Sequence, residues 1–387
     1  MSDRKSYPLF KVQVAKDAAL DNLSAVFDSG FINEGVEVGR LTEALKPVLG
    51  SDNIVLMNSC TSALTVALRL AGVGPGKNVV TSPMTCIASN TPIINLGAAI
   101  KWADIDPISG MITPETVAAE IDENTAAVLF VDWAGVPAPL AELWAVCKKA
   151  GVKMIQDAAH AFMAEYEGRP VAQFADFTCF SFQAIKHFTC GDGGALVCAD
   201  EADRRAAAKL KWFGYDREAA KDEKGNWKAQ QAEADILESE VGYKFNMNNV
   251  AAAIGLANLP QMEQVVGRHR ANAAVYDAAF AAHPLIQPIR RPEGSNPAFW
   301  VYTTILDPSV DRDGVIEELA KVGIHSGQVH VPNDDYTCFA AYRRDLPGVR
   351  EFSARQISLP CGWWLGEHDA QFIAESVLAK LRRVAAA

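Results

Sequence analysis

The chain has 387 residues, which is long enough for two domains, or for one large domain with a smaller lobe, around a substantial core. Its charge is acidic, with 36 lysines and arginines against 47 aspartates and glutamates, which disfavours a nucleic-acid partner. No run of about eighteen apolar residues appears, and no apolar signal core follows the first residues, so we expect a soluble, cytoplasmic protein without a membrane segment.

The first half of the chain alternates strand-like and helix-like segments. Short, nearly continuous apolar runs, typical of strands that are covered on both faces, occupy 54–57, 79–81, 100–103, 127–131, 152–155 and 177–182. Apolar residues at the helical spacings of three and four occupy 61–71, 114–121 and 140–150. This alternation predicts an α/β fold with a mostly parallel sheet.

The pattern changes after Gly214. Residues 216–240 are crowded with charge and contain Lys224-Gly225-Asn226, which predicts a surface flap, with disorder as the alternative. Helices are predicted at 249–259 and 264–282, and a strand at 299–306. Two further helices are predicted at 313–322 and 369–383. We therefore expect a large domain over residues 1–260 and a small C-terminal α/β domain over residues 261–387.

The cysteines are scattered, and none forms a Cys-x-x-Cys pair. Several lie in strand-like apolar segments, so we expect reduced, buried thiols rather than disulfides or a zinc site, and we predict no metal. They are Cys60, Cys86, Cys147, Cys179, Cys190, Cys198, Cys338 and Cys361.

Lys186 lies on a tight connection between two predicted strands. A strand at 176–182 precedes it, and Gly191, Gly193 and Gly194 permit a sharp return of the backbone before a second strand at 195–198. Most lysines are solvated surface charges, but an amine held just after a buried strand can form a Schiff base with an aldehyde. That is the chemistry of pyridoxal phosphate enzymes.

Small polar residues follow other predicted strands. Ligands of parallel sheets gather at the carboxyl ends of the strands, so these residues are interpreted together. After the strand at 54–57, Ser59, Cys60 and Thr61 open a helix whose free N–H groups would suit a phosphate, with an ordinary helix cap as an equal alternative. Ser181, five residues before Lys186, could supply a second phosphate hydroxyl.

Asp157 and His160 follow the strand at 152–155. A carboxylate there could bind a protonated pyridine nitrogen, and a histidine three residues later could reach the phenolic oxygen. Taken separately, Asp157 is better explained as a helix cap and His160 as a core histidine. Together with a phosphate cradle and a lysine, in that chain order at three strand ends, they predict a pyridoxal phosphate site. The carboxylate would keep the ring nitrogen protonated, and the lysine would hold the aldehyde and then move a proton.

The chain resembles the DegT/DnrJ/EryC1/StrS sugar aminotransferases, which have the aspartate aminotransferase fold. The resemblance spans nearly the whole chain and rests on the segments SGFINEG (29–35), GVGPG (72–76), QDAAH (156–160), SFQAIK (181–186) and ISLP (357–360). It implies a three-layer α/β fold around a mostly parallel sheet, with a smaller C-terminal α/β domain. It also implies a homodimer in which each active site is built from both chains.

The resemblance assigns roles to particular residues. It implies Lys186 as the Schiff base residue, Asp157 at the pyridine nitrogen, and His160, commonly glutamine in the family, near the ring hydroxyl. The residues implied at the phosphate are Thr61, Cys60 and Ser181.

Three positions depart from the family pattern. Where relatives read Ser-Gly-Thr, this chain reads Ser59-Cys60-Thr61. The change should preserve the backbone N–H contacts, but the Cys60 side chain crowds the turn. Cys86 stands where relatives often place an aromatic ring against the cofactor, so the stacking area is smaller. Lys244, in the segment GYKFNM (242–247), replaces an asparagine that in relatives reaches the phosphate of the partner subunit, and it puts a charged contact in place of a neutral one.

The implied reaction is ping-pong. Glutamate would donate nitrogen to give pyridoxamine phosphate, which would then aminate a keto sugar carried on a nucleotide. The polar segment 326–336 departs from common family versions and is a candidate sugar site, alternatively an ordinary domain connection, and His330 is its best candidate residue. Asn33, in the N-terminal motif, is a second candidate for substrate binding. Which sugar carbon and which nucleotide are involved stays open.

Other functions fit the sequence less well. The glycines at 72–76 have the wrong spacing for a phosphate-binding loop, and Asn78 stands where a magnesium-binding Ser or Thr would be. The Gly-x-Gly-x-x-Gly of a dinucleotide oxidoreductase is missing after the first strand. Dehydratase relatives typically carry histidine at the Lys186 position, and His187 is one place out of register, so Lys186 favours amino transfer. The intact Lys186 and Asp157 also disfavour a regulatory relative without turnover.

Overall fold

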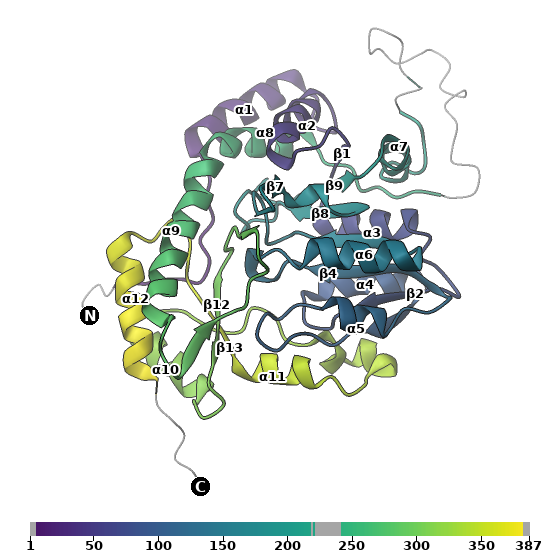
Figure 1. Ribbon diagram of the computed structural model, residues 1–387. Coiled ribbons are helices and arrows are strands. Elements are labelled where there is room, and N and C mark those ends of the chain that lie inside the picture. The colour runs from purple at the N-terminus through teal and green to yellow at the C-terminus, as the bar shows by residue number, and fades with distance from the viewer. Residues whose placement is uncertain (1–4, 218–219, 221–240, 382–387) are drawn as a thin grey trace.

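The computed structural model describes residues 5–217, 220 and 241–381 (Figure 1). Most of the segment predicted as a charged flap, 216–240, lies outside the described residues. Among the described helices, none is both long and apolar enough to cross a membrane. All eight cysteines carry free thiols, and six of them are buried.

A seven-stranded sheet forms the centre of the larger part of the molecule (Figure 1). Its strands are β1 (Ile54–Met57), β2 (Asn78–Thr81), β3 (Ala99–Trp102), β4 (Thr125–Val131), β5 (Lys153–Asp157), β8 (Phe177–Ser181) and β9 (Gly194–Cys198). They lie in the order β1-β9-β8-β5-β4-β2-β3. Strand β9 is antiparallel to both of its neighbours, and the other neighbouring strands are parallel. The predicted mostly parallel α/β fold is therefore confirmed.

Helices cover both faces of this sheet, which is why its strands are apolar and nearly continuous (Figure 1). They are α3 (Cys60–Leu70), α4 (Ile87–Asn95), α5 (Pro114–Ala118), α6 (Leu140–Ala150) and α7 (Glu201–Leu210). Helix α3 packs against β5, β8 and β9 and also contacts α4, whereas α6 packs against β5 and contacts α5. The helices predicted at 61–71, 114–121 and 140–150 correspond to α3, α5 and α6.

Two N-terminal helices that the sequence patterns did not predict pack on a third from the middle of the chain. They are α1 (Lys16–Ser29) and α2 (Val36–Leu49), and both contact α8 (Asn249–Asn258). Helix α2 buries Val38, Leu41, Leu45 and Leu49, the spacing of one helical face. The buried face of α2 is covered by α8, which lies about two hundred residues away in the chain.

The C-terminal part adds a smaller antiparallel sheet, β10-β12-β13, flanked by helices. Its elements are α9 (Met262–Phe280), β10 (Ile286–Pro288), β12 (Tyr302–Leu306), α10 (Arg312–Ala320), α11 (Pro347–Arg355), β13 (Gln356–Leu359) and α12 (Glu367–Lys380). The strand predicted at 299–306 begins only at Tyr302, because Phe299 has a φ of +52°, which strand geometry does not allow. The domain boundary at residue 260 stays a prediction.

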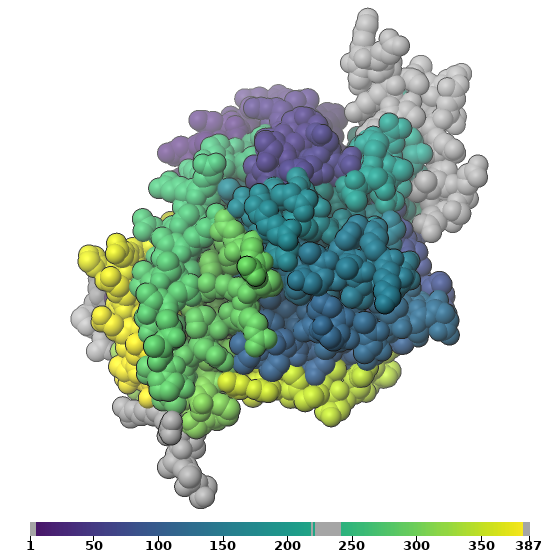
Figure 2. Space-filling view, viewed as in Figure 1, coloured from purple at the N-terminus to yellow at the C-terminus, as the bar shows by residue number. Residues whose placement is uncertain are grey.

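The C-terminal part packs directly along the sheet-bearing part, as the green and yellow surface in Figure 2 shows. A short sheet joins the two parts, formed by β6 (Glu165–Tyr166), β7 (Arg169–Pro170) and β11 (Ser295–Asn296). Short 3₁₀ helices span Trp133–Gly135, Val171–Gln173, Leu259–Gln261, Asn333–Asp335 and Thr337–Tyr342.

Gly135 lets the two parts approach each other beside the carboxyl end of β5. Its φ is +89°, and a Cβ there would lie 2.5 Å from the His160 carbonyl oxygen and 2.9 Å from the Phe299 nitrogen. It would also lie 3.0 Å from the Trp300 nitrogen. Only glycine fits such an approach without strain, so this residue brings the backbone near Trp300 to the strand end that carries Asp157 and His160.

Candidate active site

Lys186 lies on the connection between β8 and β9, where the sequence predicted it. Its backbone N–H donates to the Gln183 carbonyl at 3.0 Å in a tight turn. The side chain is half-buried, and the loss of water around the amine lowers the pKa of Lys186 to about 8. Its electrostatic neighbours are Asp157, Cys86 and Cys60. The structure therefore brings together four residues that end or follow strands of the large sheet, namely β1, β2, β5 and β8.

Asp157 is the last residue of β5, and its carboxylate is buried. One oxygen accepts a hydrogen bond from the Ser89 hydroxyl at 2.7 Å, and the other accepts one from the Ala159 N–H at 3.0 Å. Burial raises the pKa of Asp157, while these donors and the positive charge of Lys186 oppose that rise. The carboxylate is thus held in a fixed orientation at the strand end, with a cation beside it.

His160 lies in a row of aromatic rings next to this pair. Its ring stacks on Trp300 with centroids 4.1 Å apart and faces His330 at 5.5 Å. Burial lowers the pKa of His160 well below its usual range and that of His330 to about 3, so both rings are neutral near pH 7. His160 Nδ1 and His330 Nε2 are buried without a hydrogen-bond partner among the described residues. Two polar atoms therefore remain available to a ligand.

The start of helix α3 lies beside the end of β8. Ser59 caps the helix, its hydroxyl accepting from the Ser62 N–H at 3.1 Å, so the helix-cap alternative is correct for Ser59. Cys60 and Thr61 are then the first two residues of the helix, where backbone N–H groups have no partner inside the helix.

Gly194 explains how Ser181 comes close to this helix start. It is the strand partner of Met57 at the end of β1 and of Ser181 at the end of β8. A Cβ at Gly194 would lie 2.5 Å from the Cys60 nitrogen, so the missing side chain makes room for Cys60 in a turn that the sequence predicts to be crowded. The N–H groups of α3 and the Ser181 hydroxyl thus border one spot that suits an anion.

Cys86 precedes helix α4 and is half-exposed. It is an electrostatic neighbour of both Lys186 and Cys60, so the structure groups it with the other site residues. In all, the residues that the structure brings together are Cys60, Thr61, Cys86, Asp157, His160, Ser181, Lys186 and His330.

Asn33 and Lys244 belong to a different cluster. The Lys244 amine contacts the Asn246 side chain and lies 4.0 Å from the Trp212 ring centroid. Asn246 in turn donates to Asn33 at 3.1 Å. Burial lowers the pKa of Lys244, and its charged neighbours are Glu34 and Arg217 rather than the residues around Lys186. Among the described residues, the contacts of Asn33 and Lys244 do not include the Lys186 cluster.

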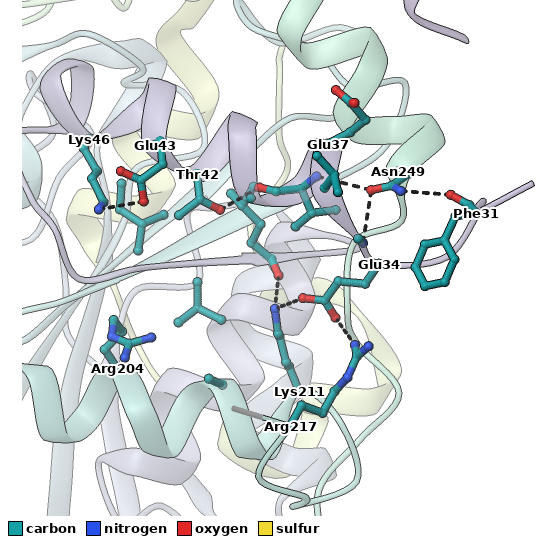
Figure 3. Close-up of a pocket in the computed structure, with 18 of the residues that line it drawn as sticks. Phe31, Glu34, Glu37, Thr42, Glu43, Lys46, Arg204, Lys211, Arg217 and Asn249 are labelled. Carbon is teal, nitrogen blue, oxygen red and sulfur yellow. Dashed lines mark hydrogen bonds and ion pairs between the residues drawn. The ribbon is translucent and has the colours of Figure 1, made fainter. Parts of the chain in front are cut away.

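A cavity of about 1360 Å³ opens beside this second cluster, between α2 and α7 (Figure 3). Glu34 lies in its wall, and its two carboxylate oxygens bind Lys211 at 2.5 Å and Arg217 at 2.9 Å. Lys186 and Asp157 are not among the residues that line it. The ion pairs of Glu34 anchor the segment that carries Asn33 to the body of the same chain.

Sequence patterns missed two residues of the Lys186 cluster. Ser89 is in the small polar run at the start of α4, but only the fold shows that its hydroxyl reaches Asp157. Trp300 was part of a predicted strand, and its contacts with His160 and Lys186 come from packing between the two parts of the molecule. No local signal in the sequence marks either contact.

Comparisons with known proteins identify the family of this chain. The model of the DegT/DnrJ/EryC1/StrS aminotransferase family matches residues 13–378. The spore coat polysaccharide biosynthesis protein SpsC of Bacillus subtilis is 30% identical over 375 residues, which cover 92% of this chain and 93% of SpsC.

Solved structures of similar fold cover almost the entire chain. The sugar aminotransferase CalS13 from Micromonospora echinospora is 32% identical, with a TM-score of 0.89 over 96% of this chain and 99% of CalS13. The PLP form of Spr1654 from Streptococcus pneumoniae, described as a sugar aminotransferase, is 25% identical, with a TM-score of 0.87 over 98% of this chain and 100% of Spr1654. Spr1654 has also been solved in a PMP form. This chain belongs to the DegT/DnrJ/EryC1/StrS aminotransferase family.

Proposed function

We propose that this protein uses pyridoxal phosphate to move an amino group from glutamate to a keto sugar. The observation that carries the proposal is the pairing of a half-buried lysine, whose pKa is lowered to about 8, with the buried carboxylate of Asp157 at the next strand end. The names of the relatives, a polysaccharide biosynthesis protein and sugar aminotransferases, support a sugar as acceptor.

The described residues fit pyridoxal phosphate by their chemistry. The phosphate would take the N–H groups at Cys60 and Thr61 and the Ser181 hydroxyl. The ring nitrogen would take Asp157, and the unpartnered Nδ1 of His160 is a candidate for the ring hydroxyl. Cys86 would pack against the ring, and its small thiol offers less stacking area than an aromatic side chain. The two PLP and PMP structures of the relative Spr1654 support the same cofactor.

Lys186 and Asp157 have complementary tasks in this proposal. Pyridoxal phosphate, when bound, would supply an electron sink for the electron pair left on the substrate carbon when its proton is removed. Asp157, oriented by Ser89, keeps its negative charge facing the ring nitrogen and so holds a proton on that nitrogen. The Lys186 amine can both release and accept a proton near neutral pH, because its pKa is lowered to about 8.

A dehydratase fits these contacts less well. Lys186 stands where dehydratase relatives typically carry histidine. The neighbouring His187 does not take over the role of that histidine. The His187 Nε2 donates to the Ala298 carbonyl at 3.0 Å, and its ring packs on His269 with centroids 4.6 Å apart. Its hydrogen bond and packing are therefore those of a structural residue.

The sugar would enter next to His330. The unpartnered Nε2 of His330 is a hydrogen-bonding atom, and its ring also contacts Trp133 edge-on at 5.8 Å. Segment 330–333 is fixed to the large sheet, because Asn333 donates to the Thr85 carbonyl at 2.8 Å and its own N–H donates to the Pro83 carbonyl at 2.7 Å. A nucleotide carrier for the sugar is part of the proposal.

The test is a pair of half-reactions followed by absorbance. Glutamate is expected to convert the pyridoxal form of the purified protein into the pyridoxamine form, and keto sugars, free or nucleotide-linked, are then screened for the one that restores it. No change with glutamate would remove glutamate as donor. Failure with every amino donor, on protein that binds the cofactor, would refute the transaminase assignment.

Lys186→Ala provides the matched variant. It is expected to lose turnover while still holding pyridoxamine phosphate, which needs no bond to the lysine. Full activity of this variant would contradict the role of Lys186.

We also propose that two copies share their active sites, with Asn33 and Lys244 acting in the site of the partner. The side chains of Phe31, Ile32 and Val36 are 53%, 52% and 73% exposed, an apolar patch of the kind that marks an interface. This segment is held rigidly, because Asn249 binds the Phe31 carbonyl at 2.9 Å and the Gly35 N–H at 3.1 Å.

Subunit complementation tests this sharing directly. Lys186→Ala and Asn33→Ala proteins are unfolded together, refolded as a mixture and assayed. If Asn33 acts in the partner's site, random pairing restores about a quarter of wild-type activity, because half of the dimers contain one intact site. Activity no greater than the mean of the two variants, or light scattering that gives the 41.8 kDa mass of one chain, would refute the proposal. The cytoplasmic location stays a prediction.

A further inference from the structure

Trp300 contacts the active-site lysine from the C-terminal part of the molecule. It lies just before β12 and is 3% exposed, whereas Lys186 follows β8 of the large sheet. Its position is thus independent of the local sequence around the lysine.

Two contacts join Trp300 to the lysine turn. The indole N–H donates to the carbonyl of Ile185 at 2.8 Å, which fixes the backbone one residue before Lys186. The Lys186 Nζ lies 3.7 Å from the centroid of the Trp300 ring, within the range in which an aromatic face attracts an ammonium group. One side chain therefore holds both the backbone and the amine of the lysine.

Neighbouring rings hold the indole itself. Phe10 stacks on Trp300 with centroids 4.7 Å apart and planes inclined by 22°. His160 stacks on it at 4.1 Å and 18°. Tilting of the indole would break at least one of these stacks.

The backbone next to Trp300 is also tied down. The Ala298 carbonyl accepts from His187 at 3.0 Å, and the Phe299 carbonyl accepts from His269 at 2.7 Å. The Ala298 N–H donates to the Gly135 carbonyl at 2.9 Å. Because a carbonyl only accepts, each of the two histidines must donate a ring N–H. The support for Trp300 is thus rigid from backbone to ring.

The reaction makes such a support useful. Under the proposed function, on which this inference rests, the lysine is bonded to the cofactor in one state and free in the other. A free lysine side chain samples many rotamers, and each misplaced rotamer delays the next bond to the cofactor. We propose that Trp300 is a positioning residue that holds the Lys186 amine whenever it is not bonded to the cofactor.

The experiment compares two forms of the cofactor on the apoprotein. Pyridoxal phosphate must bond to Lys186, so its capture, trapped with borohydride and measured by mass spectrometry, reports the position of the amine. Pyridoxamine phosphate has no aldehyde, so its affinity reports only whether the rest of the site is intact. Trp300→Phe keeps a ring but removes the N–H, and Trp300→Leu removes both contacts.

We expect capture to slow about tenfold in Trp300→Leu and about threefold in Trp300→Phe. Affinity for pyridoxamine phosphate should stay within about twofold in both. Trp363 is the control, since its indole N–H also donates to a backbone carbonyl, that of Lys11 at 3.3 Å, and the Lys11 amine lies 5.4 Å from its ring. Trp363→Phe and Trp363→Leu should change neither quantity.

Several outcomes would overturn the inference. Unchanged or faster capture in Trp300→Leu would show that the indole does not position the amine. Equal losses in capture and in pyridoxamine phosphate affinity in Trp300→Leu would mean that Trp300 only maintains the fold. In that case Trp300→Phe, which keeps a ring to fill the space, would behave like wild type. Wild-type protein that takes up neither cofactor would instead refute the proposed function.

Discussion

The carboxyl group of Asp132 makes the stability of this protein depend on pH. Asp132 follows β4 and is fully buried. One oxygen accepts from the Ala138 N–H at 3.0 Å and the other from the Gln156 side chain at 2.7 Å. Burial raises the pKa of Asp132 to about 7, and the negative charge of Asp157 adds to this rise. We predict that Asp132→Asn removes one contribution to the pH dependence of the unfolding free energy between pH 5 and pH 8, a contribution that appears as the difference between variant and wild type.

The expected size follows from proton linkage. An aspartate in the unfolded chain has a pKa of about 3.9, so between there and pH 7 the folded state binds a proton that the unfolded state lacks. The stabilisation from this group is complete below pH 4 and is lost as the pH rises through 7. Because about two pH units separate pH 5 from this pKa, at 1.36 kcal/mol each, the contribution of Asp132 to the unfolding free energy should fall by about 2.7 kcal/mol between pH 5 and pH 8.

The assay is urea unfolding of the apoprotein at pH 5, 6, 7 and 8. Asn cannot ionise, so the difference in unfolding free energy between Asp132→Asn and wild type should change by about 2.7 kcal/mol across this range, in favour of the variant at high pH. Thr178→Val is the control, since Thr178 donates to the same Gln156 at 3.1 Å but does not titrate. It should cost about 1 kcal/mol at every pH. Parallel pH curves for wild type and Asp132→Asn would refute the reasoning.

Three further substitutions test the site and its supports. Asp157→Asn should slow the glutamate half-reaction in stopped flow about 100-fold or more, because an amide does not hold a proton on the ring nitrogen; a rate near wild type would contradict this role. Gly135→Ala should lower the unfolding free energy by about 3 kcal/mol, because its Cβ would lie 2.5 Å from a backbone oxygen. Gly151→Ala, also at positive φ but with no atom within 4 Å of its Cβ, should cost only about 1 kcal/mol, and equal costs would disprove the steric argument. Glu34→Gln should cost about 2 kcal/mol by removing the carboxylate shared by two cations, whereas Glu37→Gln, whose partner is 62% exposed, should cost under about 0.5 kcal/mol in the same denaturation assay.

Strand ends were the most informative part of the sequence. Lys186, Asp157 and Ser181 each follow or end an apolar run, and the carboxyl ends of parallel strands meet at one edge of a sheet. The local pattern alone was therefore enough to place these residues together. The start of α3 was found in the same way, because small polar residues follow the strand β1.

Other contacts had no local signal. Helix α1 and helix α2 were missed, since their buried faces are defined by α8. Trp300 lies in a segment predicted as a strand, but the strand begins only at Tyr302, after the positive φ of Phe299. The amphipathic pattern of a helix, or the apolar run of a strand, does not indicate which distant surface will cover it.

The sequence by itself determined the parallel sheet, the lysine at its edge and the carboxylate beside it. The spacing of apolar residues, the length of apolar runs and the positions of glycines are local properties of the chain. Tertiary structure alone decided the hydrogen bond from Ser89 to Asp157, the stacking of Trp300 on His160 and the separation of Asn33 and Lys244 from Lys186. Each of these joins segments far apart in the chain, and only the packing of the two parts of the molecule brings such segments within contact distance.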